Sequence, residues 1–339
     1  MKHWQQYNTE EQLQLLDITS GATGLPRLAI EKDWWVTAVL KALSLTQFSH
    51  LMSFKGGTSL SKGWQLINRF SEDIDIALKR EEHFLIKGTS NNQLAKVRRT
   101  ARHYIIRELP LELNLALESF GVTNFTIEPE ISRTKDGVTK ELRADTDPSV
   151  IFVNYNSIVP ETSEYVQPRV KIEISCRSMD EPIKELQLSS FISTSVPESE
   201  DMDVKFNTVI PTRTFLEKIF LLHEEFLSER PQSYRMSRHL YDLEKIMDND
   251  FGLNALSDGQ LYMDIVRHRS IFNKLKNVDY SSHYPCRINF LPPTSVINEW
   301  ENDYNKMKET FIYDPNKISF DNLVKRMREL QERVRKIKI

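Results

Sequence analysis

Apolar residues recur at two different spacings along the chain, and each spacing predicts a different kind of element. Residues 30–43 carry apolar side chains at mostly helical spacing, which predicts a buried helix. The acids Glu31 and Asp33 suit the first turn of that helix, where the helix dipole favours negative charge. A long basic helix is predicted for residues 92–108, with more helix after Pro110.

Strand-like segments occupy the middle of the chain. Residues 51–54 form a short apolar run, and residues 73–78 alternate acidic and apolar side chains. Between these two segments, a pair of glycines followed by hydroxyl residues predicts a turn and then a helix over residues 58–67. Stretches with a period of two, at 149–158 and 168–176, are also typical of strands. Together these segments predict a sheet.

From residue 211 onward the pattern becomes helical, and no strong strand signal returns. The helical stretches include TRTFLEKIFLLHEEFL, RMSRHLYDLEKIM and LYMDIVRHRSIFNKL. The predicted fold class is therefore α/β (α+β), with a core domain at residues 1–205 and a helical domain at residues 206–339.

The last predicted helix has a narrow apolar seam among many basic residues. The seam residues are spaced four, three, four and three apart: Leu323, Met327, Leu330, Val334 and Ile337. Two interpretations stay open at this point. The seam packs on the chain's own core, or it binds a partner or a second copy of the chain.

Composition describes an ordinary globular protein of 339 residues with 40% apolar residues and a net charge of −3. That length is enough to bury a large core and suggests about two domains. The sequence shows no apolar run of membrane-spanning length, and its start lacks the apolar stretch of a secretory signal, so we expect a cytoplasmic protein with no membrane partner. Cys176 and Cys286 are too isolated to predict a disulfide framework or a thiolate zinc site.

The two glycines at positions 56 and 57 are the first candidate for chemistry. Glycines between a strand and a helix let the backbone come close to a ligand, and the first helical turn presents N–H groups suited to phosphate. Thr58 and Ser59 add hydroxyl groups next to Gly56 and Gly57. This stretch is a candidate nucleotide-binding turn. A glycine turn with a capping hydroxyl also starts many helices that bind no ligand.

Acidic residues on the predicted strands are the second candidate. Asp73 and Asp75 are two residues apart, so they project from one face of a strand, where their repulsion favours a bound cation such as Mg²⁺. In the later strand, Glu173 is the candidate third carboxylate, to hold a metal or to accept a proton. The alternatives are a surface strand that happens to alternate, and a solvated Glu173 paired with Lys171.

Several stretches, in the same order, resemble the AbiEii/AbiGii toxin family within the polymerase-beta-like nucleotidyltransferase superfamily. They span about residues 31–243 and are EKDWWV, FKGGTSLSKGW, RFSEDIDI, VKIEIS, RTFLEKIFLLHEE and RHLYDL. The resemblance implies a nucleotidyltransferase core with a mixed sheet, followed by the helical domain, with the nucleotide and metals in a cleft between the two.

The resemblance also implies an activity. It implies transfer of a nucleoside monophosphate from an NTP, with release of pyrophosphate and with Mg²⁺, or Mn²⁺ in its place, as cofactor. Members of the family are toxins of toxin–antitoxin systems, some linked to phage defence, and some modify the 3′ end of tRNA. We therefore expect an RNA acceptor, with tRNA first, and a cognate antitoxin.

Residue roles follow from the matched motifs. Asp73 and Asp75 would hold the metals, and the turn from Gly56 to Ser59 would receive the triphosphate. Lys218 in FLEKIF would contact phosphates, and Asp242 in RHLYDL would be the downstream acid of the site. The family often has Arg-Asp at the start of that last motif, where this chain has Arg-His.

Without the resemblance, both helical residues have simpler interpretations. Lys218 would be an exposed lysine beside Glu217, and Asp242 would form a salt bridge with Arg238 one turn earlier.

Basic residues suggest where the acceptor binds. Arg98 and Arg102 are four residues apart in the long basic helix, which carries no acid between Lys96 and Arg107. Arg267 and Arg269 are further candidates in the helical part. An ordinary solvated face is the alternative for each of them.

Two other functions remain open from the sequence. One is a non-catalytic binding module that keeps the nucleotide-binding fold and acts through its helical surface. The other is a nucleotidyltransferase that acts on a protein or on a small molecule. Three close acids argue for the enzyme, because their mutual repulsion calls for a cation.

Overall fold

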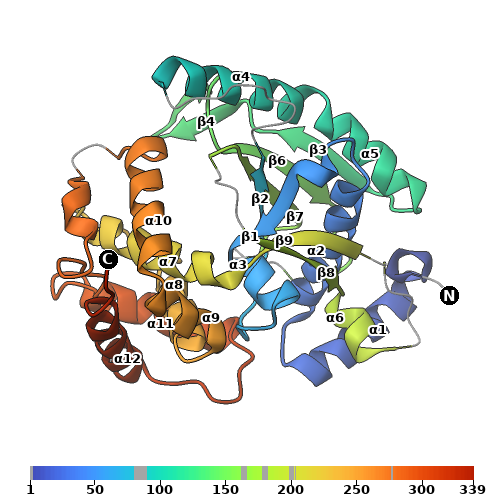
Figure 1. Cartoon of the computed structure of the whole chain (residues 1–339). Coiled ribbons are helices and arrows are strands. Elements are labelled where there is room, and N and C mark those ends of the chain that lie inside the picture. Colours follow the sequence, from blue (N-terminus) through green and yellow to red (C-terminus); the bar gives the residue numbers. More distant parts are fainter. Residues whose placement is uncertain are drawn as a thin grey trace. The chain divides into compact units, whose positions relative to one another are not determined.

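The computed structural model describes residues 3–79, 90–161, 166–177, 182–197, 202, 204–275 and 278–339 (Figure 1). The chain divides into two compact units. The first consists of Met1–Gly63 and Phe70–Val209, and the second of Trp64–Arg69 and Ile210–Ile339. The boundary that the sequence predicts between residues 205 and 206 falls inside strand β9 (Val204–Val209), which belongs to the first unit.

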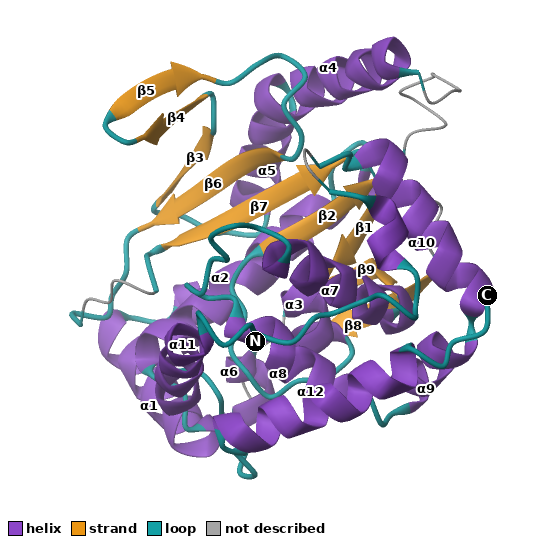
Figure 2. Ribbon diagram, turned by 90° about the vertical axis from the view of Figure 1, so that its left-hand side faces the viewer, coloured by secondary structure: helices purple, strands orange, loops and turns teal. Residues whose placement is uncertain are grey.

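A seven-stranded sheet is the centre of the first unit, with the strand order β3-β6-β7-β2-β1-β9-β8 (Figure 2). The strands besides β9 are β1 (Met52–Lys55), β2 (Ile74–Leu78), β3 (Phe125–Pro129), β6 (Ser149–Tyr155), β7 (Arg169–Ser175) and β8 (Ile183–Leu188). β1 pairs antiparallel with β2, whereas β2 pairs parallel with β7 and β1 pairs parallel with β9. The sheet is therefore mixed, and the predicted α/β (α+β) class is confirmed.

A separate hairpin lies outside this sheet and is formed by β4 (Ser132–Lys135) and β5 (Val138–Glu141). Figure 2 shows it standing apart from the large sheet. Nearly all of its residues are exposed.

Helices cover the sheet of the first unit. They are α1 (Thr9–Thr23), α2 (Arg27–Ser44), α4 (Asn91–Arg107), α5 (Leu109–Ser119) and α6 (Phe191–Ser195), with short helical turns at Trp4–Gln6 and Ser49–Leu51. α2 packs against β7 and β9, and it is buried nearly all round, as its many apolar residues require. α4 packs against β6 and α5.

Two local predictions in this unit are wrong. α2 begins at Arg27, so Glu31 and Asp33 lie beyond its first turn, and both are buried. The helix predicted over residues 58–67 is also shorter: α3 (Gly56–Thr58) continues as a π-helical turn that ends at Gly63. Shortly after that turn, Gln65 has a φ of 53°, a left-handed conformation that does not continue a helix.

The second unit is helical in the part of the chain that the structure describes. Its helices are α7 (Pro211–Phe226), α8 (Ser237–Ile246), α9 (Asp250–Ser257), α10 (Gly259–Phe272), α11 (Ile297–Thr310) and α12 (Phe320–Val334), with a helical turn at Tyr280–His283. α12 packs against α8 and α11, and all five residues of its apolar seam are buried. The seam therefore belongs to the core of this unit, and the partner interpretation is wrong.

Two further expectations concern the chain as a whole. None of the described helices has both the length and the apolar character needed to cross a membrane. Cys176 is buried and Cys286 is exposed, and neither takes part in a disulfide in the structure.

Candidate active site

The turn after β1 requires glycine at its first position. Gly56 has a φ of 78°, in the left-handed region that side chains rarely adopt. The β1–β2 register places Lys55 opposite Asp75, which brings the Asp75 carboxylate against the Gly56 backbone. A Cβ atom on Gly56 would lie 1.9 Å from Asp75 Oδ2. The Gly-Gly turn and the acidic strand are therefore parts of one structure.

The two hydroxyl residues of the turn bind the protein itself. Thr58 and Ser59 are each 1% exposed. The Thr58 hydroxyl donates to the backbone oxygen of Asp73 at 2.5 Å and lies 2.9 Å from the Ser71 hydroxyl. The Ser59 hydroxyl donates to the Gly56 carbonyl at 2.9 Å. Both hydroxyl groups hold the turn together. Thr58 also fixes the backbone just before β2, a contact that the sequence did not predict.

Asp73 and Asp75 lie on one face of the sheet. Ile74 and Ile76 point the other way and are 0% exposed, whereas both aspartates are half-buried. On the neighbouring parallel strand, Glu173 is level with Asp75. Side chains that are level on adjacent strands project to the same side, so the three carboxylates share a face of the sheet.

The fit of this face to a divalent cation rests on the aspartate pair. Among the described residues, no three acidic, histidine or cysteine side chains come together closely enough to hold a metal ion. Glu173 forms an ion pair with Lys171 instead, which is the alternative that the sequence left open. Mg²⁺ commonly takes only one or two carboxylates and completes its shell with water and substrate phosphate oxygens. Asp73 and Asp75 are a suitable donor set for that ion.

A buried ion pair holds the segment in front of the aspartates. Lys32 on α2 lies 2.7 Å from Glu72, and both side chains are 5% exposed. The Lys32 ammonium group also donates to the Gln167 carbonyl at 3.1 Å. Glu72 directly precedes Asp73, so this pair ties α2 to the start of β2.

The acids that flank Lys32 on α2 bind two other segments. Asp33 accepts hydrogen bonds from Lys62 at 2.7 Å and from the Phe191 backbone N–H at 2.8 Å. Glu31 accepts from the Ser157 hydroxyl at 2.5 Å and from the Ile158 backbone N–H at 2.9 Å. Burial raises the pKa of Glu31, although these two hydrogen bonds act in the opposite direction.

A second charged cluster lies within the helical unit around Asp242, which is 0% exposed. Arg69 binds both of its carboxylate oxygens, at 2.6 and 2.8 Å. Lys218 on α7 lies 2.8 Å from Asp242, and its ammonium group is 3.3 Å from Nδ1 of His239 on α8. The structure thus brings Lys218 and Asp242 together, as two residues of one site would be.

Burial and charge set the protonation of this cluster. Burial alone would raise the pKa of Asp242, but Arg69 and Lys218 lower it well below its usual value, so this carboxylate is ionised. Burial lowers the pKa of Lys218, with Asp242 acting in the opposite direction. Burial, together with Lys218 and Arg238, holds the pKa of His239 well below its usual value, so the imidazole is neutral.

The simpler interpretations of these two helical residues are wrong. Lys218 is buried, and Glu217 pairs with Arg213. The ion pairs of Asp242 join it to Lys218 and Arg69. Sequence reasoning missed Arg69 because the residue is 173 positions from its partner, and no local pattern marks such a pair.

The candidate acceptor-binding arginines differ in how exposed their side chains are. Arg102 is 3% exposed and donates to the Glu130 carbonyl at 2.9 Å, so it does not share an exposed face with Arg98, which is half-buried. Arg269 is mostly buried in an ion pair with Glu224. These two arginines stabilise their own units. Arg267 is exposed and lies 3.2 Å from the Asp264 carboxylate.

Comparison with solved structures identifies the fold. The fold is similar to that of MenT4, a nucleotidyltransferase toxin from Mycobacterium tuberculosis H37Rv, with a TM-score of 0.52 and 15% sequence identity. The similarity covers 92% of this chain and 85% of MenT4. The mixed sheet with its helices is therefore a fold that nucleotidyltransferase toxins use.

The sequence identifies the family. Residues 38–326 match the family described as "Nucleotidyl transferase AbiEii toxin, Type IV TA system". The chain belongs to this AbiEii family of nucleotidyltransferase toxins of type IV toxin–antitoxin systems. Among proteins with curated functions, none matches the sequence significantly.

Proposed function

We propose that this nucleotidyltransferase moves a nucleoside monophosphate from an NTP to the 3′ end of tRNA, and that Asp73 and Asp75 hold the divalent cation that the reaction needs. The cation would be Mg²⁺, with Mn²⁺ able to replace it. A cognate antitoxin would control the activity, and the system would serve in phage defence. Membership in a family of nucleotidyltransferase toxins of type IV toxin–antitoxin systems supports both the nucleotide transfer and the cognate antitoxin.

One observation carries the assignment of the centre. The Asp75 carboxylate lies against the backbone of Gly56, and the Asp73 backbone is held by Thr58. A nucleotide whose phosphates approach the Gly56–Gly57 backbone therefore meets the two carboxylates at once. A cation bound there would neutralise negative charge on the triphosphate and on the attacking oxygen.

Each step of the proposed transfer can be assigned to a side chain of the site. The RNA 3′ hydroxyl attacks the α-phosphorus, a new O–P bond forms, and the bond to the β-phosphate oxygen breaks as pyrophosphate leaves. Asp73 and Asp75 would hold the cation, which would help to orient the triphosphate, and Glu173 is the candidate to accept the hydroxyl proton. Lys218 is proposed to stabilise the charge of the pyrophosphate, with Asp242 positioning it.

The test is to incubate the protein with Mg²⁺, total bacterial RNA and each α-labelled NTP in turn, and to resolve RNA and protein on one gel. Asp73→Asn removes one carboxylate of the pair. Glu309→Gln is the matched control, because Glu309 is exposed on α11. We expect label on a tRNA-sized band with the native protein and the control, and none with Asp73→Asn.

Other outcomes reject specific parts of the proposal. Label on the protein band would replace the RNA acceptor with a protein acceptor. An equal signal from Asp73→Asn would remove Asp73 from the centre. Absence of label with every NTP, from a preparation that binds nucleotide and Mg²⁺, would favour a binding module over an active transferase.

A further inference from the structure

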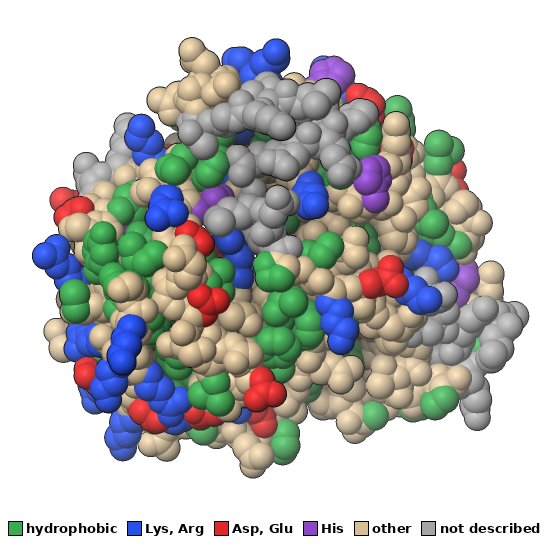
Figure 3. All heavy atoms as spheres, viewed as in Figure 1, with side chains coloured by type: hydrophobic (Ala, Val, Ile, Leu, Met, Phe, Trp, Pro, Cys, Tyr) green, Lys and Arg blue, Asp and Glu red, His purple; other side chains and the backbone are tan. Residues whose placement is uncertain are grey.

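A row of basic residues runs along the outer side of α4. Lys96, Arg99, His103 and Arg107 follow one another at steps of three, four and four residues, so they lie on one face of the helix. All four are exposed. We call these four residues the α4 stripe. Figure 3 shows basic and histidine side chains at the upper edge of the view, where Figure 1 places α4.

The opposite side of α4 explains why the stripe faces outward. Leu94, Val97, Ala101 and Ile105 are buried and pack this helix on the first unit. Arg102 lies with them, because its guanidinium group is bound to the Glu130 carbonyl and to Ser149. The stripe residues have no part in that packing, so their charges are not needed to hold the helix in place.

The charge of α4 is one-sided. The helix carries five Lys and Arg residues and no Asp or Glu between Asn91 and Arg107, although the whole chain has a net charge of −3. A surface helix that serves only solubility usually mixes both signs. This one presents a local positive field in a weakly acidic protein.

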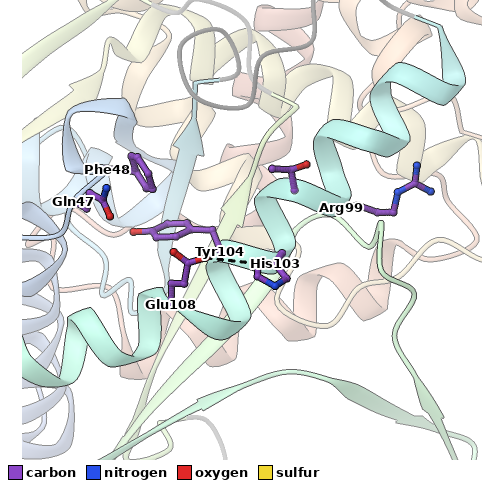
Figure 4. Close-up of a pocket in the computed structure, with 7 residues that line it drawn as sticks. Gln47, Phe48, Arg99, His103, Tyr104 and Glu108 are labelled. Atoms are coloured by element: carbon purple, nitrogen blue, oxygen red, sulfur yellow. Dashed lines mark ion pairs between the residues drawn. The ribbon is translucent and has the colours of Figure 1, made fainter.

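A pocket of about 450 Å³ opens along the stripe (Figure 4). Arg99, Thr100 and His103 line it from α4, with Gln47 and Phe48 from the segment before β1. Figure 4 shows Gln47, Phe48 and Tyr104 close together, and Arg99 extended at the other end. His103 lies 3.6 Å from the Glu108 carboxylate at the edge of this pocket.

The spacing of the stripe suits a nucleic-acid backbone. Steps of three or four residues along a helix correspond to about 4.5–6 Å along its axis. Successive phosphates of an extended strand follow each other at comparable steps, so each residue of the stripe would meet its own phosphate. The pocket between Arg99 and His103 is polar enough for one nucleotide of that strand.

We propose that the α4 stripe and its pocket form an RNA-binding surface, and that the acceptor RNA docks there. This inference rests on the proposed function, because it takes RNA as the acceptor. It replaces Arg102 of the predicted acceptor surface with Lys96, Arg99, His103 and Arg107.

The test measures binding rather than transfer. The triple variant Lys96→Ala, Arg99→Ala, Arg107→Ala removes three charges of the stripe. The control variant Lys325→Ala, Arg328→Ala, Lys336→Ala removes three exposed charges near the C-terminus. Affinity for unfractionated bacterial tRNA is measured by filter binding between 50 and 300 mM KCl, after thermal melting has shown that both variants are folded.

The expected result is a loss of affinity that depends on salt. Each phosphate contact contributes roughly 0.7–0.9 to the slope of log affinity against log salt, so the stripe variant should lower that slope by about 2 to 3. Its affinity at 100 mM salt should fall by at least about tenfold, and the control should bind like the native protein. Thr100→Trp, which fills the pocket and keeps every charge, should weaken binding without changing the slope.

Unchanged affinity and slope in the stripe variant would overturn the inference, and so would native protein that does not bind tRNA. Neither readout needs nucleotide transfer. If the protein binds tRNA through the stripe but transfers no label to RNA, the proposed function is refuted, whereas the RNA-binding surface is still supported. If the stripe variant transfers nucleotide to tRNA as fast as the native protein does, the RNA-binding surface is refuted and the proposed function is not.

Discussion

At the scale of single residues, the candidate centre depends on one glycine. Gly56 adopts a left-handed backbone, and the Asp75 carboxylate occupies the space where a side chain would begin. Both features follow from the β1–β2 pairing, which puts Lys55 opposite Asp75. The glycine is therefore needed for the shape of the site as well as for the turn.

Gly56→Ala should destabilise the fold and abolish transfer. The methyl group strains a left-handed backbone and meets Asp75, which together cost about 1–3 kcal/mol of unfolding free energy. Urea unfolding and a transfer assay measure the two effects. Gly21→Ala is the matched control, because Gly21 lies in α1 with nothing near its Cβ position, and it should stabilise the protein by up to about 1 kcal/mol. Equal behaviour of the two variants would contradict this account of Gly56.

Asp73→Asn should leave the stability nearly unchanged or improve it when no metal is present. Two half-buried carboxylates on one strand face repel each other, and removing one charge relieves that repulsion. Thermal melting in EDTA measures this. A drop in the melting temperature of more than about 5 °C would instead indicate that Asp73 is a structural residue.

Sequence predicts residues at this scale when the signal is local. The alternation of Asp73 and Asp75 with isoleucine is visible in four positions of the chain and places both on one face. The bidentate contact of Arg69 with Asp242 joins residues 173 positions apart, and only the fold reveals it. The burial of Arg102 was missed for the same reason, because its partners belong to other segments.

At the scale of elements, α2 organises the centre through three consecutive charged residues. Glu31, Lys32 and Asp33 are buried, and each binds a different part of the first unit. Lys32 is the one that reaches the segment before β2, through Glu72. A buried charge without its partner is costly, so these contacts hold the segments in place.

Lys32→Met should cost about 3–5 kcal/mol of unfolding free energy, because it removes the Lys32 cation from the buried Glu72 carboxylate. Urea unfolding measures the loss. The double variant Lys32→Met, Glu72→Leu should recover much of it, since it removes both charges together. A single variant that costs less than about 1 kcal/mol would show that the pair does not hold this segment.

Element boundaries were predictable where apolar periodicity decides them, as in α4 and α12. The start of α2 was predicted too late in the sequence, because acids such as Glu31 and Asp33 are typical of a first helical turn. Both are in fact buried, and a hydrophobic pattern alone does not predict buried acids. The helix after the Gly-Gly turn was predicted too long, because its first hydroxyl binds the strand segment instead of capping a helix.

At the scale of the whole molecule, buried histidines make stability depend on pH. Burial lowers the pKa of His223 and, with Lys218 and Arg238, holds that of His239 well below the usual value. Unfolding exposes both rings, which then take up protons at about pH 6.5. The unfolded chain therefore binds more protons than the folded one below that pH, so stability falls as the pH is lowered.

The free energy of unfolding should decrease below about pH 6.5, by up to about 1.4 kcal/mol per pH unit for each of these histidines. Urea unfolding between pH 5 and pH 7.5 measures the slope. His239→Gln should reduce this slope by as much as one histidine contributes. Asp242 does not contribute in this range, because its stabilisation is lost only in stronger acid. A slope that His239→Gln leaves unaltered would contradict the buried neutral imidazole.

The order of the motifs was enough to predict the fold class and the family, both of which the comparisons confirm.

The most direct measurement is the initial rate of nucleotide transfer to tRNA by Asp75→Asn, beside native protein and Glu309→Gln. The account predicts a fall of at least about a thousandfold for Asp75→Asn, because a metal ligand contributes several kcal/mol to the transition state. Glu309→Gln should keep the native rate. A rate for Asp75→Asn within a factor of about ten of the native one would contradict the assignment of the centre to the carboxylates beside Gly56.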